Sequence, residues 1–377
     1  MMLKKKFSLC LIIPIILILT TCQSSWEIPV INNGQQMGVI DKKSVSFYIQ
    51  KYQGDVQSIP LGQMFYYIGY TLIDEASFIT DKDPGVTYTW DEIAETSMIS
   101  ETGQITLPDG TSFQPDDIEV VPSDLLTDIE YSIMDISPTV AYALGLPALP
   151  QAIGKVIYKT EVDHAVMILL DGTQYKKLSN MANAGELPFL GENGKLQRGI
   201  TVYPSISTSG SAAFLTGLPP HENGVFGYGY RSTESTTLFD LAVQEGKSVT
   251  AVEGSSLPFN LRNAETTLSG DRDGDGFSDD NVYEKALDVI RSGMPDILYI
   301  HFHEIDDMGH SYGPESSQYS SAIERVDQYL SDIYNRLPES TLIIIFADHG
   351  MHTTTEGGNH GTLTANDLVI PIIILEK

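Results

Sequence analysis

Four continuous apolar runs after residue 160 constrain the fold more than any other feature of the chain. They cover residues 166–170, 297–300, 342–346 and 368–375. Short runs without polar alternation are typical of strands that are covered on both faces. Two segments between them, 281–292 and 316–337, have helical spacing, and the second repeats apolar residues on one face from Tyr319 to Ile333. Strands that alternate with helices predict a layered α/β fold with a largely parallel sheet.

The first part of the chain has a different pattern, in which short apolar runs are separated by turn signals. The runs that predict strands are 45–49, 71–79 and 118–121. Thr89 and Glu92 have the spacing of a capping box, which predicts a helix through Ile93, Ala94 and Met98. We therefore expect a small strand-rich α+β domain at 26–130, with no assigned role, ahead of a core domain at 134–377.

The N-terminus has the three-part pattern of an export signal, with Lys4, Lys5 and Lys6 followed by an apolar run at 7–19. That run is shorter than the roughly 20 residues that a spanning helix needs. Cys22, after Leu19-Thr20-Thr21, resembles the lipidated cysteine of a bacterial lipoprotein leader, although Thr21 departs from the usual small residue. The pattern predicts a leader at 1–22 and an exported, membrane-anchored lipoprotein that faces the periplasm or the exterior. A plain or uncleaved signal is the alternative.

The composition excludes some functions and some metal sites. The chain has 22 Lys+Arg against 50 Asp+Glu, a formal net charge of -28, and such a surface repels phosphate backbones. Coating of nucleic acid is therefore excluded, and no obligate protein partner is indicated. Cys10 and Cys22 are the 2 cysteines of the chain, so the body has no thiol. A metal in the body must be held by oxygen and imidazole nitrogen.

Three predicted strands are followed by an acid: Asp171, Asp306 and Asp348. In open α/β sheets, ligands bind beyond the carboxyl ends of the strands. Three carboxylates at one edge repel each other unless cations lie between them, so their convergence predicts bound metal. Any one of these acids, taken alone, is better explained as a turn or cap residue.

Histidines lie beside these acids. His310 follows Asp306 by four residues, His349 adjoins Asp348, and His360 lies in Gly358-Asn359-His360-Gly361. Sets of Asp and His without thiolate suit zinc or manganese. The set is large enough for two ions if water or substrate completes their coordination.

Five strings, in order, resemble the alkaline phosphatase superfamily and most closely its type I phosphodiesterase/nucleotide pyrophosphatase branch: ILLDG, YPSISTSGSAAFLTGLPPHENGVFG, EIDDMGHSYGP, FADHGM and GNHG. The resemblance implies a three-layer α/β/α core and two Zn²⁺ ions, with Mn²⁺ as the alternative. It implies that Asp171, Asp348, His349 and the oxygen of Ser207 hold one ion. Asp306, His310 and His360 would hold the other.

The same resemblance implies a reaction. Ser207 would be the nucleophile, with Thr208 as the fallback, and a phosphoserine would form during hydrolysis of phosphodiester or pyrophosphate bonds of a small phosphorylated substrate. A phosphomonoesterase or phosphonate hydrolase on the same core is the alternative within enzymes. A surface lipoprotein that binds metal without turnover is the alternative of another class.

The chain departs from the family pattern at two places. Gly210 stands where the branch usually has an Asn that donates to a phosphate oxygen, which leaves diester preference open. The segment 134–157 resembles one that relatives have after the last core strand. We therefore hypothesise a circular permutation in which 134–157 packs beside 370–375; an ordinary linker helix is the alternative.

A sulfatase is disfavoured because no Cys/Ser-x-Pro-x-Arg motif surrounds Ser207.

An acidic segment matches the first half of an EF-hand loop, with Asp271, Asp273, Asp275 and Asp279 at ligand positions. Val282 replaces the bidentate acid at position twelve, so calcium and a solvated acidic turn are equally supported. We interpret His352 as a residue that supports a metal ligand, and His301 and His303 as strand residues.

Overall fold

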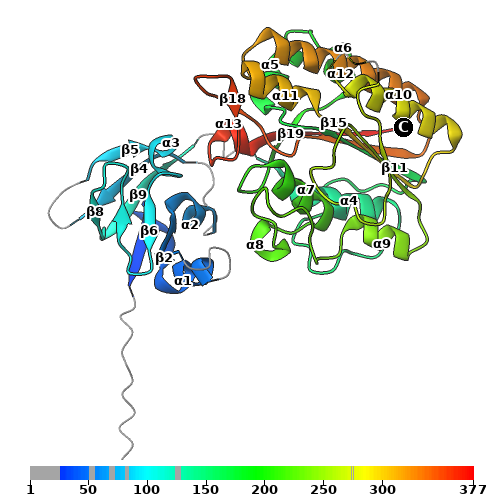
Figure 1. Ribbon diagram of the computed structural model, residues 1–377. Coiled ribbons are helices and arrows are strands. Elements are labelled where there is room, and N and C mark those ends of the chain that lie inside the picture. The colour runs from blue at the N-terminus through cyan, green and yellow to red at the C-terminus, as the bar shows by residue number, and fades with distance from the viewer. Residues whose placement is uncertain are drawn as a thin grey trace, which may run out of the picture.

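The computed structural model describes residues 26–50, 56–67, 73–80, 85–123, 129–272, 274 and 276–377 (Figure 1). The predicted leader, including Cys22, lies outside these residues. Among the helices of the described part, none combines the length and the apolar character that crossing a bilayer requires.

The core is one eight-stranded sheet with the order β10-β12-β19-β16-β11-β15-β13-β14. Its strands are β10 (Tyr131–Ser132), β11 (His164–Leu170), β12 (Gln197–Ile200), β13 (Val249–Glu253), β14 (Glu265–Leu268), β15 (Ile297–Phe302), β16 (Thr341–Phe346) and β19 (Val369–Glu376). β19 runs antiparallel to both of its neighbours, and the other pairings are parallel. The sheet is therefore largely parallel, as the apolar runs predicted.

Alternate residues of β11 pack into two different helical layers. Ala165, Met167 and Leu169 belong to a core cluster with α4 (Ile136–Ala143), α7 (Ser207–Thr216) and α9 (Leu238–Gln244). Val166, Ile168 and Leu170 pack on the other face. The helices of that face are α5 (Tyr175–Asn183), α6 (Pro188–Asn193), α10 (Asp279–Ser292) and α12 (Ser317–Arg336). Figure 1 shows α4, α7 and α9 on one side of the sheet and α10 and α12 on the other, which makes a three-layer α/β/α core.

The two predicted helices of the core are α10 and α12. Ser316 caps α12 by accepting a hydrogen bond from the backbone of Tyr319, and Leu337 is its C-cap residue. The predicted apolar stripe on α12 is buried, and its members all belong to one core cluster: Tyr319, Ile323, Val326, Leu330 and Ile333. The stripe is therefore core packing, as its helical period indicated.

The N-terminal region is strand-rich and has two small sheets. The first has the order β2 (Gln35–Asp41), β1 (Glu27–Asn32), β9 (Asp117–Pro122), β4 (Ile73–Ile79) and β5 (Thr87–Thr89). The second has the order β3 (Ser58–Pro60), β6 (Met98–Ser100), β7 (Ile105–Thr106) and β8 (Ser112–Phe113). Helices α1 (Lys42–Tyr48) and α2 (Leu61–Tyr67) accompany these sheets.

Two predictions for this region are wrong. Residues 45–49, predicted as a strand, lie mostly in helix α1, because Asp41 accepts the backbone N–H of Ser44 at 2.8 Å and starts a helix there. The predicted helix after Thr89 does have its capping box, but it forms only α3 (Trp90–Ile93), and Met98 begins strand β6. Pairing of β6 with β3 and β7 outweighs the helical pattern there.

The segment at 134–157 packs on the sheet beside the last strand. Ile136 and Val140 of α4 share one core cluster with Ile370 and Ile372 of β19. Just past the segment, Tyr158 donates a hydrogen bond to Glu376 at 2.9 Å. This is the packing that the permutation hypothesis requires, while permutation itself stays a hypothesis.

Candidate metal and catalytic site

The structure brings the seven predicted site residues to the carboxyl edge of the core sheet. Asp171 directly follows β11, and Asp348 and His349 follow β16 after Ala347. Because β11 and β16 are paired parallel strands, with Leu169 opposite Phe346, these acids leave the sheet side by side. Asp306 and His310 lie four residues apart on helix α11 (Glu304–Tyr312), so both lie on one face. His360 follows β18 (Gly358–Asn359), and Ser207 is the first residue of α7.

The first cluster surrounds the imidazole of His349. Its Nε2 lies 3.3 Å from Oδ1 of Asp171, 3.6 Å from Oδ2 of Asp348 and 3.2 Å from Oγ of Ser207. Its Nδ1 lies 2.9 Å from the carbonyl oxygen of Gly350, which can only accept, so Nδ1 has the proton of the neutral ring. The Nε2 lone pair then faces two carboxylate oxygens, an arrangement that a cation stabilises.

The second cluster places two imidazole lone pairs face to face. Nε2 of His310 lies 3.1 Å from Nε2 of His360 and 3.2 Å from Oδ2 of Asp306. Nδ1 of His310 donates to the carbonyl of Gly358 at 3.2 Å, and Nδ1 of His360 donates to that of Ser205 at 3.1 Å. Because both protons of the neutral rings are on Nδ1, the opposed Nε2 atoms repel each other unless a cation lies between them.

The donor set fits divalent cations by its charge as well. Among the described residues, Oδ1 of Asp171, Oδ1 of Asp306 and Oδ2 of Asp348 are buried without a hydrogen-bond partner. Burial and the charge of Asp171 raise the pKa of Asp348 to about 7. Burial and the proximity of His349 lower the pKa of His360 to about 4, so this ring is neutral and able to bind metal at pH 7. The buried oxygens without partners are therefore candidate metal ligands.

His349 lies within reach of both clusters. Ligand atoms of Asp171, Asp348 and His349 all lie within 4.8 Å of one another, and so do those of Asp306, His349 and His360. The rings of His349 and His360 stack with centroids 3.7 Å apart. The two candidate ion positions are thus neighbours, which a two-metal site requires.

The two candidate nucleophiles have different surroundings. The hydroxyl of Thr208 donates to the carbonyl of Gly227 at 3.2 Å, and the residue is buried. The hydroxyl of Ser207 instead lies against His349, at the start of a helix whose first turn no side chain caps. The open backbone N–H groups of that turn favour an anion. This geometry favours Ser207 over Thr208.

Sequence reasoning missed several residues that support the site. Ser205 holds the loop of His360 in place, because its hydroxyl donates to Thr362 at 2.8 Å while its carbonyl accepts from His360. His301 and His303 contact Asp171, and Glu253 contacts both of these histidines. The alternation His301-Phe302-His303 at a strand end was the available signal, since it places both histidines on one face.

The remaining predicted residues lie outside the two clusters. Nδ1 of His352 lies 2.9 Å from Oδ1 of Asp367, which is not one of the predicted metal ligands. Asp279 accepts the backbone N–H groups of His303 and Glu304 at 2.8 and 3.0 Å, so it anchors the start of α11. Asp271 accepts from Gly274 and Gly276 within its own turn. Asp273 and Asp275 lie outside the described residues, so calcium stays a prediction.

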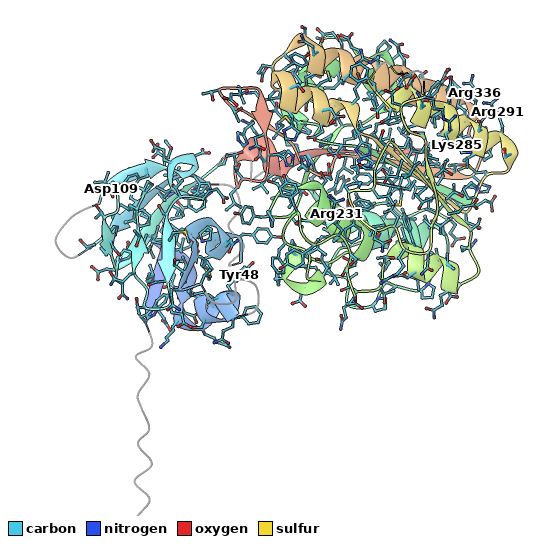
Figure 2. All side chains as sticks on the ribbon, viewed as in Figure 1. Tyr48, Asp109, Arg231, Lys285, Arg291 and Arg336 are labelled. Atoms are coloured by element: carbon cyan, nitrogen blue, oxygen red, sulfur yellow. The ribbon has the colours of Figure 1, made fainter. Side chains whose placement is uncertain are left out.

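Four basic side chains of the described residues are labelled in Figure 2 and lie away from the acids or contact other groups. Lys285, Arg291 and Arg336 lie over α10 and the end of α12 (Figure 2). Arg291 and Arg336 come shortly before β15 and β16 begin, at the amino edge of the sheet, opposite the acids. Arg231 donates to the carbonyl of Leu257 at 3.2 Å.

The class that the fold and site define is a three-layer α/β/α protein with clustered Asp and His side chains at the carboxyl edge of its sheet, where open α/β sheets bind ligands. The sequence profile of the type I phosphodiesterase / nucleotide pyrophosphatase family matches residues 165–253 and 250–370, which is more than half of the chain. The chain therefore belongs to this family, as the five strings predicted.

Curated relatives match short stretches of the chain. The catalytic subunit of human GPI ethanolamine phosphate transferase 3 is 30% identical over 103 residues, which cover 27% of this chain and 8% of that protein. GPI ethanolamine phosphate transferase 2 of Yarrowia lipolytica is 35% identical over 72 residues, which cover 19% of this chain and 8% of that protein. The chain thus spans a small fraction of the length of these relatives.

Two solved structures are also similar. Phosphonoacetate hydrolase of Sinorhizobium meliloti has a TM-score of 0.40 and 20% identity, covering 50% of this chain and 56% of that one. Murine ectonucleotide pyrophosphatase / phosphodiesterase 5 has a TM-score of 0.42 and 16% identity, covering 52% of this chain and 59% of that one.

Proposed function

We propose that the protein hydrolyses phosphodiester or pyrophosphate bonds of small molecules, with Ser207 as nucleophile beside two divalent cations, zinc in the first instance. The observation that supports this most is the position of the Ser207 hydroxyl, 3.2 Å from Nε2 of His349. That nitrogen also faces Asp171 and Asp348, whose buried oxygens lack hydrogen-bond partners. A hydroxyl at this position lies next to the expected cation.

Each cation would have its own set of ligands. Asp171, Asp348, His349 and Ser207 would hold one, and Asp306, His310 and His360 would hold the other. When bound, such cations favour the ionised form of a serine hydroxyl and offset charge on the phosphoryl oxygens.

The chain itself would supply the nucleophile and the groups that bind the phosphoryl oxygens. Oγ of Ser207 would attack phosphorus in line, the bond from phosphorus to the leaving oxygen would break, and a phosphoserine would form. Water would then cleave the phosphoserine and return the serine hydroxyl and a phosphate product. The uncapped first turn of α7 would direct backbone N–H groups at the phosphoryl oxygens, in place of the Asn side chain that Gly210 cannot offer.

Transfer to an alcohol is the second candidate, supported by the similarity to proteins named GPI ethanolamine phosphate transferases. The first half-reaction would be the same. The second would differ only in the nucleophile, an acceptor hydroxyl rather than water. Phosphomonoester or phosphonate hydrolysis on the same residues is a third outcome that the test below separates.

The test compares a chromogenic phosphodiester with its matching monoester, using the zinc-loaded full chain and its Ser207→Ala and Thr208→Val variants. We expect a higher kcat/KM on the diester, and a loss of at least about 10³-fold in Ser207→Ala but not in Thr208→Val. A second series adds ethanolamine or glycerol and measures how product divides between water and alcohol. Monoester preference would reassign the enzyme as a phosphatase, and dominant transfer would reassign it as a transferase. Zinc binding without turnover on any of these esters would favour the non-catalytic alternative.

We also propose that Cys22 anchors the exported protein to a membrane. The apolar run before Cys22 and the polar residues after it support this. Mass spectrometry of the mature N-terminus tests the proposal, because a lipid on Cys22 that is absent from Cys22→Ser is expected. An unmodified N-terminus at another residue would refute it.

A further inference from the structure

The second carboxylate oxygen of Asp171 faces away from His349 and toward two other histidines. Oδ2 of Asp171 lies 3.1 Å from Nε2 of His301 and 3.6 Å from Nδ1 of His303. One ligand atom from each of these three residues lies within 4.8 Å of the others. His301 and Asp171 are buried, and the side chain of His303 is 20% exposed.

Glu253 contacts the outer nitrogen of both histidines. Its Oε2 lies 2.9 Å from Nδ1 of His301 and 3.1 Å from Nε2 of His303. A carboxylate accepts hydrogen bonds, so in the neutral rings these outer nitrogens have the protons. The inner nitrogens, Nε2 of His301 and Nδ1 of His303, then direct lone pairs toward the same oxygen of Asp171. A carboxylate that holds the outer nitrogen of a metal-binding histidine is a recurrent feature of metal sites.

The sheet places these four residues together. β15 lies between β11 and β13, with Leu170 opposite Phe302 and Val252 opposite Ile300. Asp171 and Glu253 therefore reach the carboxyl edge on either side of the His301-Phe302-His303 alternation. Three different strands are needed to build the group.

We propose that Asp171, His301 and His303 form a third divalent-cation site, with Glu253 orienting the histidines and Asp171 bridging this site to the first cluster. A ligand set of one carboxylate and two imidazoles suits zinc, cobalt or manganese, whereas magnesium and calcium prefer oxygen alone. Metal–ligand bonds of about 2.0–2.2 Å place neighbouring ligand atoms roughly 3.3 Å apart, close to the two distances from Asp171. Water would complete the coordination.

A proton is the alternative occupant of this group. If each ring were protonated on both nitrogens, the four contacts to Asp171 and Glu253 would be ion pairs without a metal, and three of them would be charge-assisted hydrogen bonds. The two rings lie with centroids 3.6 Å apart, however, and two like charges at that separation repel each other. A bound cation avoids this repulsion, because it is held by the neutral rings of His301 and His303.

The experiment measures zinc per chain on the full-length protein after dialysis, by elemental mass spectrometry. We expect three zinc ions in the wild type and two in His303→Gln. The matched control is His164→Gln at the opposite end of β11, where Nδ1 contacts the carbonyl of Pro295, and it should keep three. Glu253→Gln should weaken binding of one of the three ions by about 10–100-fold.

Anomalous scattering at the zinc edge from wild-type crystals locates the ions independently of any variant. A third peak between Asp171 and the His301–His303 pair is expected. Two ions per chain with no such peak, and no change in His303→Gln, would overturn the third site in favour of protonated rings. The zinc count of Ser207→Ala should stay at three, so failure of the proposed catalytic role and failure of the third site are distinguishable.

Discussion

Gly210 illustrates how tightly single residues are fitted around the acids. A β-carbon at this position would lie 2.8 Å from Cβ of Asp348 and 2.9 Å from its carbonyl oxygen. The same carbonyl accepts a hydrogen bond from the hydroxyl of Thr201. The glycine that departs from the family pattern is therefore required by packing, because any larger residue would displace Asp348.

Gly210→Ala should test this fit. Because backbone and Cβ atoms must move, we expect a loss of about 1–3 kcal/mol of unfolding free energy, together with weaker zinc binding. Denaturant titration and a zinc competition assay measure the two effects. Gly229→Ala is the matched control, since a β-carbon there meets no atom within 4 Å. Equal stability of Gly210→Ala and wild type would contradict the packing argument.

At the scale of elements, side chains at helix ends join segments that are distant in sequence. Asp135, ahead of α4, accepts the backbone N–H of Lys155 at 2.7 Å, and Thr139 accepts that of Ile157 at 3.0 Å. Ser137 donates to the carbonyl of Phe214, which attaches α4 to α7. These contacts use three side chains of the sequence Asp-Ile-Ser-Pro-Thr at 135–139, and they hold the helix that begins with Ser207.

Helix α9 is held by side-chain contacts of Asp240 at its N-terminus, and their contribution to stability depends on pH. Asp240 forms a capping box with Thr237 and lies 2.5 Å from Nη2 of Arg262. Burial alone would raise the pKa of Asp240. Hydrogen bonds from Arg262, Thr237 and Asn263 outweigh burial and lower this pKa to about 2. The folded-state pKa lies below the unfolded value, so the stabilisation is present above about pH 4 and is lost as pH falls toward 2.

Asp240→Asn should remove this stabilisation at neutral pH. After allowance for solvent screening, we expect a loss of about 1 kcal/mol at pH 7. The difference from wild type should shrink as pH falls from 4 to 2. Urea unfolding across that pH range makes the measurement, and a difference independent of pH would count against this role of Asp240.

At the scale of the whole molecule, the N-terminal region and the catalytic core share a continuous hydrophobic cluster. Tyr203, Leu363 and Leu368 of the core are buried with residues of the N-terminal region such as Phe65 and Trp90. Tyr203 also donates to Glu95 at 2.7 Å. Figure 1 shows the N-terminal region beside α13 (Ala365–Leu368) and close to β18, the strand that leads into His360.

Leu363→Ala should reduce stability and activity together. Removing a fully buried leucine costs about 2–5 kcal/mol, and this one lies three residues after His360. Leu330→Ala, an equally buried leucine of α12, is the control. We expect similar losses of unfolding free energy but a lower kcat/KM only for Leu363→Ala, measured well below the unfolding temperature. Equal kcat/KM in both variants would indicate that the N-terminal region does not support the site.

Metal removal should destabilise the whole protein. The acids at the carboxyl edge repel each other without cations, and ligand binding at 1,000 times Kd stabilises by about 4 kcal/mol. Chelation should therefore lower Tm by on the order of 10 °C, and added zinc should restore it. Ser207→Ala should respond like the wild type because its carboxylates and histidines remain. Scanning calorimetry makes the comparison, and a Tm that is insensitive to chelator would contradict the metal assignment.

The sequence by itself predicted the layered core, because apolar runs are local signals of buried strands, and it placed an acid after each of three strands. The resemblance of the five strings implied the family and the full set of seven residues that meet at the edge of the sheet. Residues 45–49 were predicted wrongly because the cap at Asp41, a single side-chain contact, selected helix over strand.

Only the tertiary structure decided which residues gather around those acids. The group of Glu253, His301 and His303 exists because β13 and β11 flank β15, and strand order cannot be read from apolar runs. The need for glycine at 210 and the contact of the N-terminal region with the loop of His360 have the same origin. Each depends on atoms that are distant in sequence and are brought into contact only when the chain packs.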